Sequence, residues 1–379
     1  MDTQLNILAP TRYPWFFNGP KECEHNIERR NFIPFNKISN KFEGVTFFNP
    51  LPFKRFDLIH AFNRLPIGKT PFIINFESHL PRAFGHENSA QYKYMTDMLV
   101  SDRCKGIIAI SEYARKTFLN QHEGNNAYDV LKDKVIVRYP NMVLPEDQDA
   151  FTWKDGEAFR LVFLGAHFGR KGGMVAVRIA QLAKEKNIPI QLDIISGMET
   201  GAASWVDPLR DNFFNDTFRI IKEMPNIHHH GSLPNAQVQQ LLKGAHFTLL
   251  PTFSDSFGFS VVESMAHFTP VIVTKQCALP EFVEDNQNGV LLPLELNEGG
   301  EWIHIAKHDR STPAYEKLFL EETERLAQKA IERIAYYMNN KDAYLKMRLN
   351  ARNTAEKFFD AKDANKFWNG YYRNAMEKA

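Results

Sequence analysis

Short apolar runs alternate along the chain with stretches in which apolar residues recur every three or four positions. The runs have the length of buried strands, and the stretches have the spacing of helices that cover a sheet. In the first half, the pattern predicts strands over residues 5–9, 56–61, 72–76, 106–110 and 134–138 and helices over 92–101 and 112–121. We therefore expect an α/β protein with parallel sheets.

A second series of such elements begins at Phe159 with the run FRLVFLG. It predicts strands over 190–195, 227–230, 246–250 and 270–274 and helices over 172–186, 235–243, 259–267 and 318–338. Between the two series, residues 143–157 contain Pro, Asp and Glu without periodicity, as in an interdomain linker. Because 379 residues exceed the usual size of one core, we expect two domains, 1–150 and 158–357.

Composition narrows the class of protein only a little. A net charge of +1 gives no argument for nucleic acid as a partner. Cys23, Cys104 and Cys277 have neither metal-ligand nor redox spacing, which indicates a reducing compartment. The N-terminus lacks the pattern of a signal peptide, and no apolar run approaches the roughly 18 residues that span a bilayer. We expect a cytoplasmic protein.

Candidate chemistry is concentrated at residues 251–292. A strand ends at Pro251 and leads into a polar, glycine-containing turn with Asp255 before the predicted helix and Glu263 inside it. Backbone amides at a helix N-terminus bind phosphate oxygens, and carboxylates accept hydrogen bonds from sugar hydroxyls. The segment therefore predicts a site for a sugar nucleotide, whereas a plain strand–turn–helix with solvated carboxylates is the simpler interpretation.

A second phosphate-binding pattern lies between a strand and a helix at residues 165–173, GAHFGRKGG. A glycine-rich turn with a cation at a helix N-terminus suits phosphate, and Lys171 is that cation. A surface loop with solvated charges is the alternative interpretation.

These two segments resemble the donor-binding signature of family 4 glycosyltransferases of the GT-B class. The family pattern of Pro-Ser, Glu-Gly-Phe-Gly and Glu-Ala-Met-Ala reads here as Pro251-Thr252, Asp255-Ser256-Phe257-Gly258 and Glu263-Ser264-Met265-Ala266. Lys171 matches the family lysine, whereas Ala166 stands where the family has arginine. Arg170 and His167 are both candidates to replace that arginine.

The resemblance implies roles for these residues. Lys171 would bind the donor diphosphate, Asp255 would contact the transferred sugar, and Glu263 would hold the ribose hydroxyls. Backbone groups of Gly231 and Ser232 would contact the base. The full donor-binding set implied is Gly165, Arg170, Lys171, Gly231, Ser232, Asp255, Ser256, Phe257, Gly258, Phe259 and Glu263.

In the first half, the strand over 72–76 leads into the sequence Glu77-Ser78-His79. The histidine that the family places after this strand aligns with Glu77, and His79 follows two residues later. Either side chain is a candidate to accept or orient the acceptor hydroxyl proton. The alternative is that Glu77 caps a turn and His79 is a solvated loop residue.

For the whole chain the resemblance implies the GT-B fold, with two Rossmann-like domains facing a central cleft. Its last helix, residues 358–379, would cross back to the first domain. The implied activity is transfer of a hexosyl group from a nucleoside-diphosphate sugar to a saccharide or lipid-linked acceptor, with retention and without a bound metal or other cofactor. The basic and aromatic stretch 29–55 is a candidate for peripheral contact with an anionic membrane, and a solvated face is the alternative.

Two other functions compete with this one. The missing arginine at Ala166 and the shorter Asp255 favour a nucleotide-sugar-binding subunit that has lost transfer activity. A dehydrogenase would require a Gly-x-Gly-x-x-Gly turn, which is absent from residues 5–19 and 165–173. Oligomeric state is not predicted.

Overall fold

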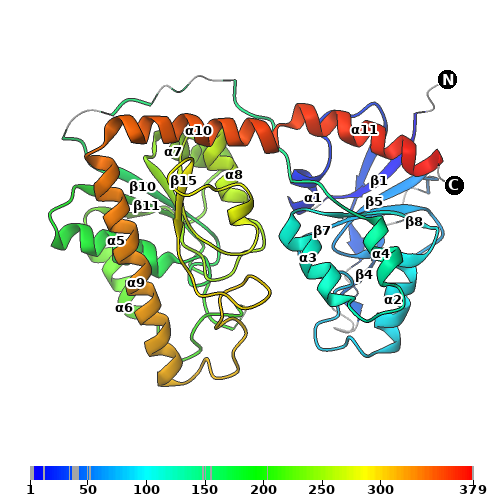
Figure 1. Ribbon diagram of the computed structural model, residues 1–379, viewed down its shortest axis with the longest axis horizontal. Helices are drawn as coiled ribbons and strands as arrows, with labels where there is room; N and C mark the ends of the chain where they lie inside the picture. Colours follow the sequence, from blue (N-terminus) through cyan, green and yellow to red (C-terminus); the bar gives the residue numbers. More distant parts are fainter. Residues whose placement is uncertain are drawn as a thin grey trace. The chain divides into compact units, whose positions relative to one another are not determined.

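The computed structural model describes residues 4–11, 13–33, 35, 42–48, 50, 53–146, 149, 151–153, 156–202 and 204–377, with the backbone alone at 13–15. Parts of the predicted linker at 143–157 and of the basic stretch 29–55 therefore lie outside the described residues. The chain forms two compact units (Figure 1). Unit 1 comprises Met1–Leu144 and Phe358–Ala379, and unit 2 comprises Pro145–Lys357.

Unit 1 is built on a parallel sheet with strand order β2-β1-β5-β7-β8-β9. These strands are β1 (Asn6–Pro10), β2 (Asn26–Arg30), β5 (Leu58–Phe62), β7 (Phe72–Phe76), β8 (Cys104–Ala109) and β9 (Val135–Val137). A small second sheet has the order β3-β4-β6, formed by β3 (Phe32–Ile33), β4 (Val45–Phe48) and β6 (Leu65–Pro66). The helices of the unit are α1 (Tyr13–Asn18), α2 (Ala90–Val100), α3 (Glu112–Gln121), α4 (Tyr128–Lys134) and the C-terminal α11 (Ala361–Glu377).

The C-terminal helix α11 covers one face of the first sheet. Its side chains Trp368 and Tyr372 are fully buried among Ile7, Leu58 and Ile73 of the strands. Polar contacts also join α11 to the start of the chain. The Asn365 side chain of α11 accepts a 2.8 Å hydrogen bond from the backbone amide of Lys21, which lies 344 positions earlier. Residues at the two ends of the chain therefore share one core.

Unit 2 is built on a second parallel sheet, with the order β12-β11-β10-β13-β14-β15. Its strands are β10 (Phe159–Leu164), β11 (Ile190–Ile195), β12 (Ile227–His229), β13 (Phe247–Leu250), β14 (Val271–Thr274) and β15 (Gly289–Leu292). Its helices are α5 (Gly173–Glu185), α6 (Asn215–Glu223), α7 (Asn235–Gly244), α8 (Phe259–Ala266), the 3₁₀ turn η3 (Leu279–Glu281), α9 (Pro313–Met338) and α10 (Lys341–Phe359), whose last two residues belong to unit 1.

Helices cover both faces of the second sheet, which explains its near-continuous apolar strands. All four residues of β13 and all four of β14 are buried. Helices α5 and α9 pack together in the larger core (Figure 1). Val238 and Leu242 of α7 pack with Val162 of β10 in a smaller core. The fold of both units is the α/β class with parallel sheets that the apolar pattern predicts.

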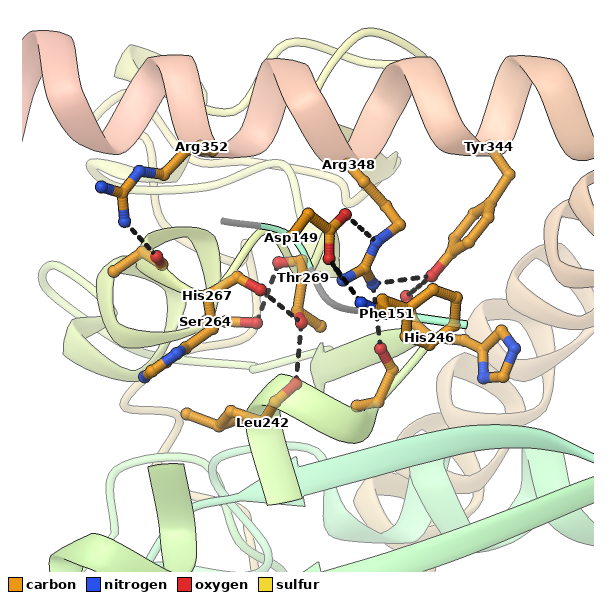
Figure 2. A network of polar contacts seen from close by, with 12 residues as sticks. Asp149, Phe151, Leu242, His246, Ser264, His267, Thr269, Tyr344, Arg348 and Arg352 are labelled. Atoms are coloured by element: carbon orange, nitrogen blue, oxygen red, sulfur yellow. Dashed lines mark hydrogen bonds and ion pairs between the residues drawn. The ribbon is translucent and has the colours of Figure 1, made fainter. Parts of the chain in front are cut away.

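A network of polar contacts ties α10 to the rest of unit 2 (Figure 2). The fully buried guanidinium of Arg348 donates to both carboxylate oxygens of Asp149, at 2.9 and 2.8 Å, and lies 3.8 Å from the centre of the Phe151 ring. Arg352 donates to the carbonyls of Ala266 at 2.6 Å and Pro145 at 2.9 Å. The start of unit 2 and the end of α8 are therefore both held by one helix.

Candidate donor site

The loop after β10 is folded tightly against the N-terminus of α5. The Lys171 amide donates to the His167 carbonyl at 3.1 Å, and the Gly173 amide donates to the Phe168 carbonyl at 2.8 Å. Gly172 precedes α5 with φ 85°, a conformation that favours glycine. A Cβ atom at Gly172 would lie 2.0 Å from the Pro251 carbonyl oxygen, so the position also requires the absence of a side chain.

That close approach is part of a continuous contact between this loop and the turn at residues 251–258, which follows β13. The Arg170 carbonyl accepts hydrogen bonds from the Phe253 amide at 2.9 Å and the Thr252 hydroxyl at 3.0 Å. In return, the Arg170 guanidinium donates to the Ser254 carbonyl at 2.5 Å. The structure therefore joins two loops that are about eighty residues apart in sequence.

Lys171 and Asp255 form an ion pair across these loops. Their side chains are only 18% and 9% exposed. Burial alone would raise the pKa of the Asp255 carboxyl, but the charges of Lys171 and Arg170 outweigh that effect and leave the pKa below its usual value. The Phe257 amide also donates to Asp255 at 3.4 Å. Asp255 is therefore an ionised carboxylate at the entrance to α8.

The remaining residues of this turn lead directly into α8. Gly258 precedes the helix with φ 86°, and a Cβ there would lie 2.8 Å from Leu279. Phe257 is buried and Phe259 is half-buried, while Ser256 is half-buried beside them. The amides of the first turn of a helix point out of its N-terminal end and lack the carbonyl four residues earlier, so this end of α8 is suited to phosphate oxygens.

Glu263 lies one turn farther along α8 and is half-buried. Burial raises the pKa of its carboxyl to about 7, although a hydrogen bond from Gln239 opposes this effect. The Gln239 side-chain nitrogen lies 3.4 Å from Glu263 Oε1. The motif identifies Glu263, but nothing in the motif indicates Gln239, which comes from α7.

Gly231 and Ser232 follow β12 at the carboxyl end of the second sheet, and Gly231 has φ 64°. The preceding His230 binds Asp193 of β11 with its ring nitrogen 2.6 Å from Oδ1. Within the described part of the chain, no three His, Cys, Asp or Glu side chains are grouped so that they could hold a metal ion.

Of the two candidates to replace the family arginine, Arg170 binds the backbone of the second loop and His167 lies 3.8 Å from the Glu199 carboxylate. Burial and the nearby charge of Arg170 lower the pKa of His167. Gly165 lies next to Lys171, since a Cβ at Gly165 would be 3.0 Å from Lys171 Cγ. Lys171 is thus the side chain that the loop directs toward Asp255.

In unit 1, Glu77 lies at the carboxyl end of β7, beside the end of β5. The Asn63 side chain accepts from the Glu77 amide at 3.1 Å and donates to Glu77 Oε1 at 3.1 Å. Arg82 donates to the same oxygen at 2.5 Å and is only 17% exposed. His79 packs edge-on against Phe84, with ring centres 5.5 Å apart. The Glu77 carboxylate is therefore held in a fixed orientation. Glu77 and His79 lie in the same loop.

Comparison with known proteins identifies the relatives of this site. Residues 158–299 match the family model described as glycosyl transferases group 1. Most of unit 2 is therefore similar to the glycosyl transferases group 1 family. The match covers both loops, Glu263 and Gln239.

Two curated relatives are glycosyltransferases by name. The uncharacterized glycosyltransferase MJ1178 of Methanocaldococcus jannaschii is 24% identical over 337 residues, which are 76% of this chain and 84% of the relative. The D-inositol 3-phosphate glycosyltransferase of Arthrobacter sp. (strain FB24) is 24% identical over 157 residues, or 41% of this chain. That match spans only 35% of the Arthrobacter protein.

Solved structures resemble the chain over nearly its full length. Anabaena Alr3699/HepE, determined in complex with UDP, aligns with a TM-score of 0.59 at 12% identity and covers 98% of this chain and 100% of its own. The glycosyltransferase from Rickettsia africae ESF-5 aligns with a TM-score of 0.59 at 16% identity, covering 99% and 100%. The chain therefore has the GT-B fold that the sequence resemblance implies, made of two Rossmann-like units.

Proposed function

We propose that this protein is a group 1 glycosyltransferase that moves a sugar from a nucleoside-diphosphate sugar to a hydroxyl of a saccharide or lipid-linked acceptor. The observation that carries the proposal is the ion pair of Lys171 with Asp255, at the junction of a glycine-rich loop and a helix N-terminus. A cation, the backbone amides of a helix N-terminus and a carboxylate in one place suit a diphosphate bonded to a polyhydroxylated sugar. UDP in the Anabaena structure supports this class of ligand.

In the proposed mechanism, charge accumulates on the departing nucleoside diphosphate. The Lys171 ammonium and the N-terminal amides of α8 stabilise that charge more strongly in the transition state than in the ground state. Asp255 accepts hydrogen bonds from hydroxyls of the sugar, and Glu263 accepts them from the ribose. Gly231 and Ser232 offer backbone groups to the base. Transfer with retention and without a bound metal is part of the same proposal.

The acceptor is assigned to unit 1. Glu77 is the better candidate to orient the acceptor hydroxyl, because Asn63 and Arg82 fix its carboxylate while His79 packs against Phe84. Contact of residues 29–55 with an anionic membrane remains a prediction. No helix in the described part of the chain is both long and apolar enough to cross a membrane.

A thermal-shift screen of UDP-, GDP- and ADP-sugars tests donor binding, because a ligand that binds the folded state raises the melting temperature. The donor that binds is then used in a transfer assay with Lys171→Ala. We expect a loss of at least roughly tenfold in rate, which corresponds to about 1.4 kcal/mol of transition-state stabilisation. Lys184→Ala, an exposed lysine of α5, is the matched control.

Wild-type turnover in Lys171→Ala would contradict the diphosphate role. Donor binding by the wild-type protein with no transfer to any acceptor would favour the alternative, a nucleotide-sugar-binding subunit without activity. The anomeric configuration of the product, read by NMR, tests retention, and turnover in excess EDTA tests independence from a metal.

A further inference from the structure

Glu263 is a mostly buried carboxyl that needs hydrogen-bond donors when it is ionised. Residues four positions apart lie on the same face of a helix. His267, the residue that follows α8, is four positions after Glu263. Both Glu263 and His267 therefore face the same neighbouring helix, α7. The α7 residue that contacts both of them is Gln239.

The contacts of Gln239 fix which way its amide points. Its oxygen Oε1 is bound to His267 Nε2, and an amide oxygen can only accept, so the histidine carries its proton on Nε2. The amide nitrogen of Gln239 is then directed away from the histidine, toward Glu263 Oε1 at 3.4 Å and Asn235 Oδ1 at 3.1 Å. His267 thus sets the amide so that it donates to Glu263.

His267 lies in the turn that follows α8, and the Thr269 hydroxyl of that turn lies 3.4 Å from the His267 carbonyl oxygen (Figure 2). The Thr269 hydroxyl donates to the Leu242 carbonyl of α7 at 2.7 Å, and the Ser264 hydroxyl donates to the Thr269 carbonyl at 3.0 Å. Arg352 of α10 binds the Ala266 carbonyl next to the histidine. The contacts from His267 through Gln239 to Glu263 therefore begin in a turn that hydrogen bonds tie to α7, α8 and α10.

We propose that Gln239 and His267 are positioning residues that hold the Glu263 carboxylate as an acceptor for the ribose diol of the nucleotide. The proposal rests on the proposed function, which places the ribose at Glu263. Gln239 engages Oε1, so Oε2 is the oxygen offered to the ligand. Neither positioning residue needs to touch the nucleotide. The ligand class that this arrangement selects is a ribonucleoside diphosphate with both ribose hydroxyls present.

The test compares the affinities of UDP and 2′-deoxy-UDP for the full chain by calorimetry, with the GDP and ADP pairs measured in parallel. The wild type should prefer the ribonucleotide. Gln239→Met keeps the length of the side chain but removes both donors, and we expect it to weaken binding of the ribonucleotide about tenfold or more. The preference over the deoxy form should fall toward one. Gln240→Met, on the exposed part of α7, is the control and should match the wild type.

A second pair of variants separates positioning from simple packing. His267→Leu removes the donor to Gln239 and should behave like Gln239→Met, whereas His267→Gln supplies a new donor and should restore the ribose preference. If Gln239→Met and His267→Leu both keep the wild-type affinity and preference, the positioning role is wrong while the proposed function stands. If the wild type binds none of the three ribonucleotides, the proposed function fails and this inference fails with it.

Discussion

Ionisation of the Glu263 carboxyl should lower the stability of the unliganded fold, although the proposed ligand-binding role uses the ionised form. Burial raises its pKa from 4.5 to about 7 in the folded protein. A carboxyl with a raised folded-state pKa favours the fold at low pH, and this contribution is lost as the pH rises from the unfolded-state pKa to the folded-state pKa. Each pKa unit corresponds to about 1.4 kcal/mol, so the ionised group costs the apo fold about 3 kcal/mol at pH 8.

Replacing Glu263 with glutamine removes this titration while keeping an oxygen that can accept from Gln239. The variant should be more stable than the wild type at pH 8 without ligand, and about 2.5 kcal/mol of the difference should develop between pH 5 and pH 8. For a unit of this size, about 2–4 °C of melting temperature corresponds to each kcal/mol, so we expect a rise of roughly 5–10 °C at pH 8. The same variant should lose most of the stabilisation that a nucleoside diphosphate gives the wild type.

The assay is calorimetric melting of the apo protein at pH 5 and pH 8, with Glu332→Gln, an exposed glutamate of α9, as the control. The pH dependence of the difference in stability between the two proteins reports on Glu263, because the wild type and the variant share every other ionisable group. An equal difference at both pH values, or a variant that melts below the wild type at pH 8, would refute the argument that the Glu263 carboxyl is held at a cost.

Two further substitutions test the framework of the site. Gly172→Ala should destabilise unit 2 by about 1–3 kcal/mol in urea unfolding, because φ is 85° and the new Cβ would lie 2.0 Å from the Pro251 oxygen, whereas Gly244→Ala, with open space around it, should not. Arg348→Met should cost about 3 kcal/mol by the same measurement, since it leaves the Asp149 carboxylate without its two donors (Figure 2), and Asp149→Ala added to it should recover part of the loss. An unchanged urea midpoint in either single variant would show that the contact does not stabilise the unit.

Most strands were predictable because they are buried on both faces and therefore read as apolar runs. Strand β7 spans the predicted residues 72–76, and β10 begins at Phe159 as expected. Strand β2 was missed because it lies at the edge of its sheet with the polar sequence NIERR. The predicted strand at 134–138 was wrong at its start, since helix α4 continues to Lys134 and the strand begins at Val135.

The C-terminal helices were predicted only in part. The apolar spacing identified residues 318–338, but α9 begins at Pro313, where the Thr312 hydroxyl caps it by accepting from the Tyr315 amide. Helix α10 was missed because its inward face is not simply apolar. The buried side of α10 includes Arg348, which forms an ion pair with Asp149 from the start of unit 2. An arginine in a sequence is usually interpreted as a surface residue, and the sequence gives no sign of a partner that lies 199 positions away.

The donor motifs indicated which loops matter, but the sequence did not indicate which neighbours hold their side chains. The motif spacing predicted that Lys171 and Asp255 belong to the site. Their ion pair forms because the two loops follow β10 and β13, which are neighbouring strands in the sheet. Gln239 belongs to no motif, because its proposed role comes from its contacts with Glu263 of α8 and with His267, the residue that follows α8. Asn63 is similar: it reaches Glu77 only because β5 and β7 are neighbouring strands.

The ion pair of Lys171 and Asp255 also explains how the site keeps its form before a ligand arrives. A lone buried lysine at the end of a glycine-rich loop would be costly, and so would a lone buried aspartate. Paired, they neutralise one another and add a charged contact to the backbone bonds through which Arg170 joins the two loops. In the proposed function, a diphosphate sugar would supply both replacements at once, because its phosphates would compete for the ammonium while its hydroxyls would donate to the carboxylate. On this proposal, the same two side chains preorganise the unliganded loops and recognise the two chemically different halves of the donor.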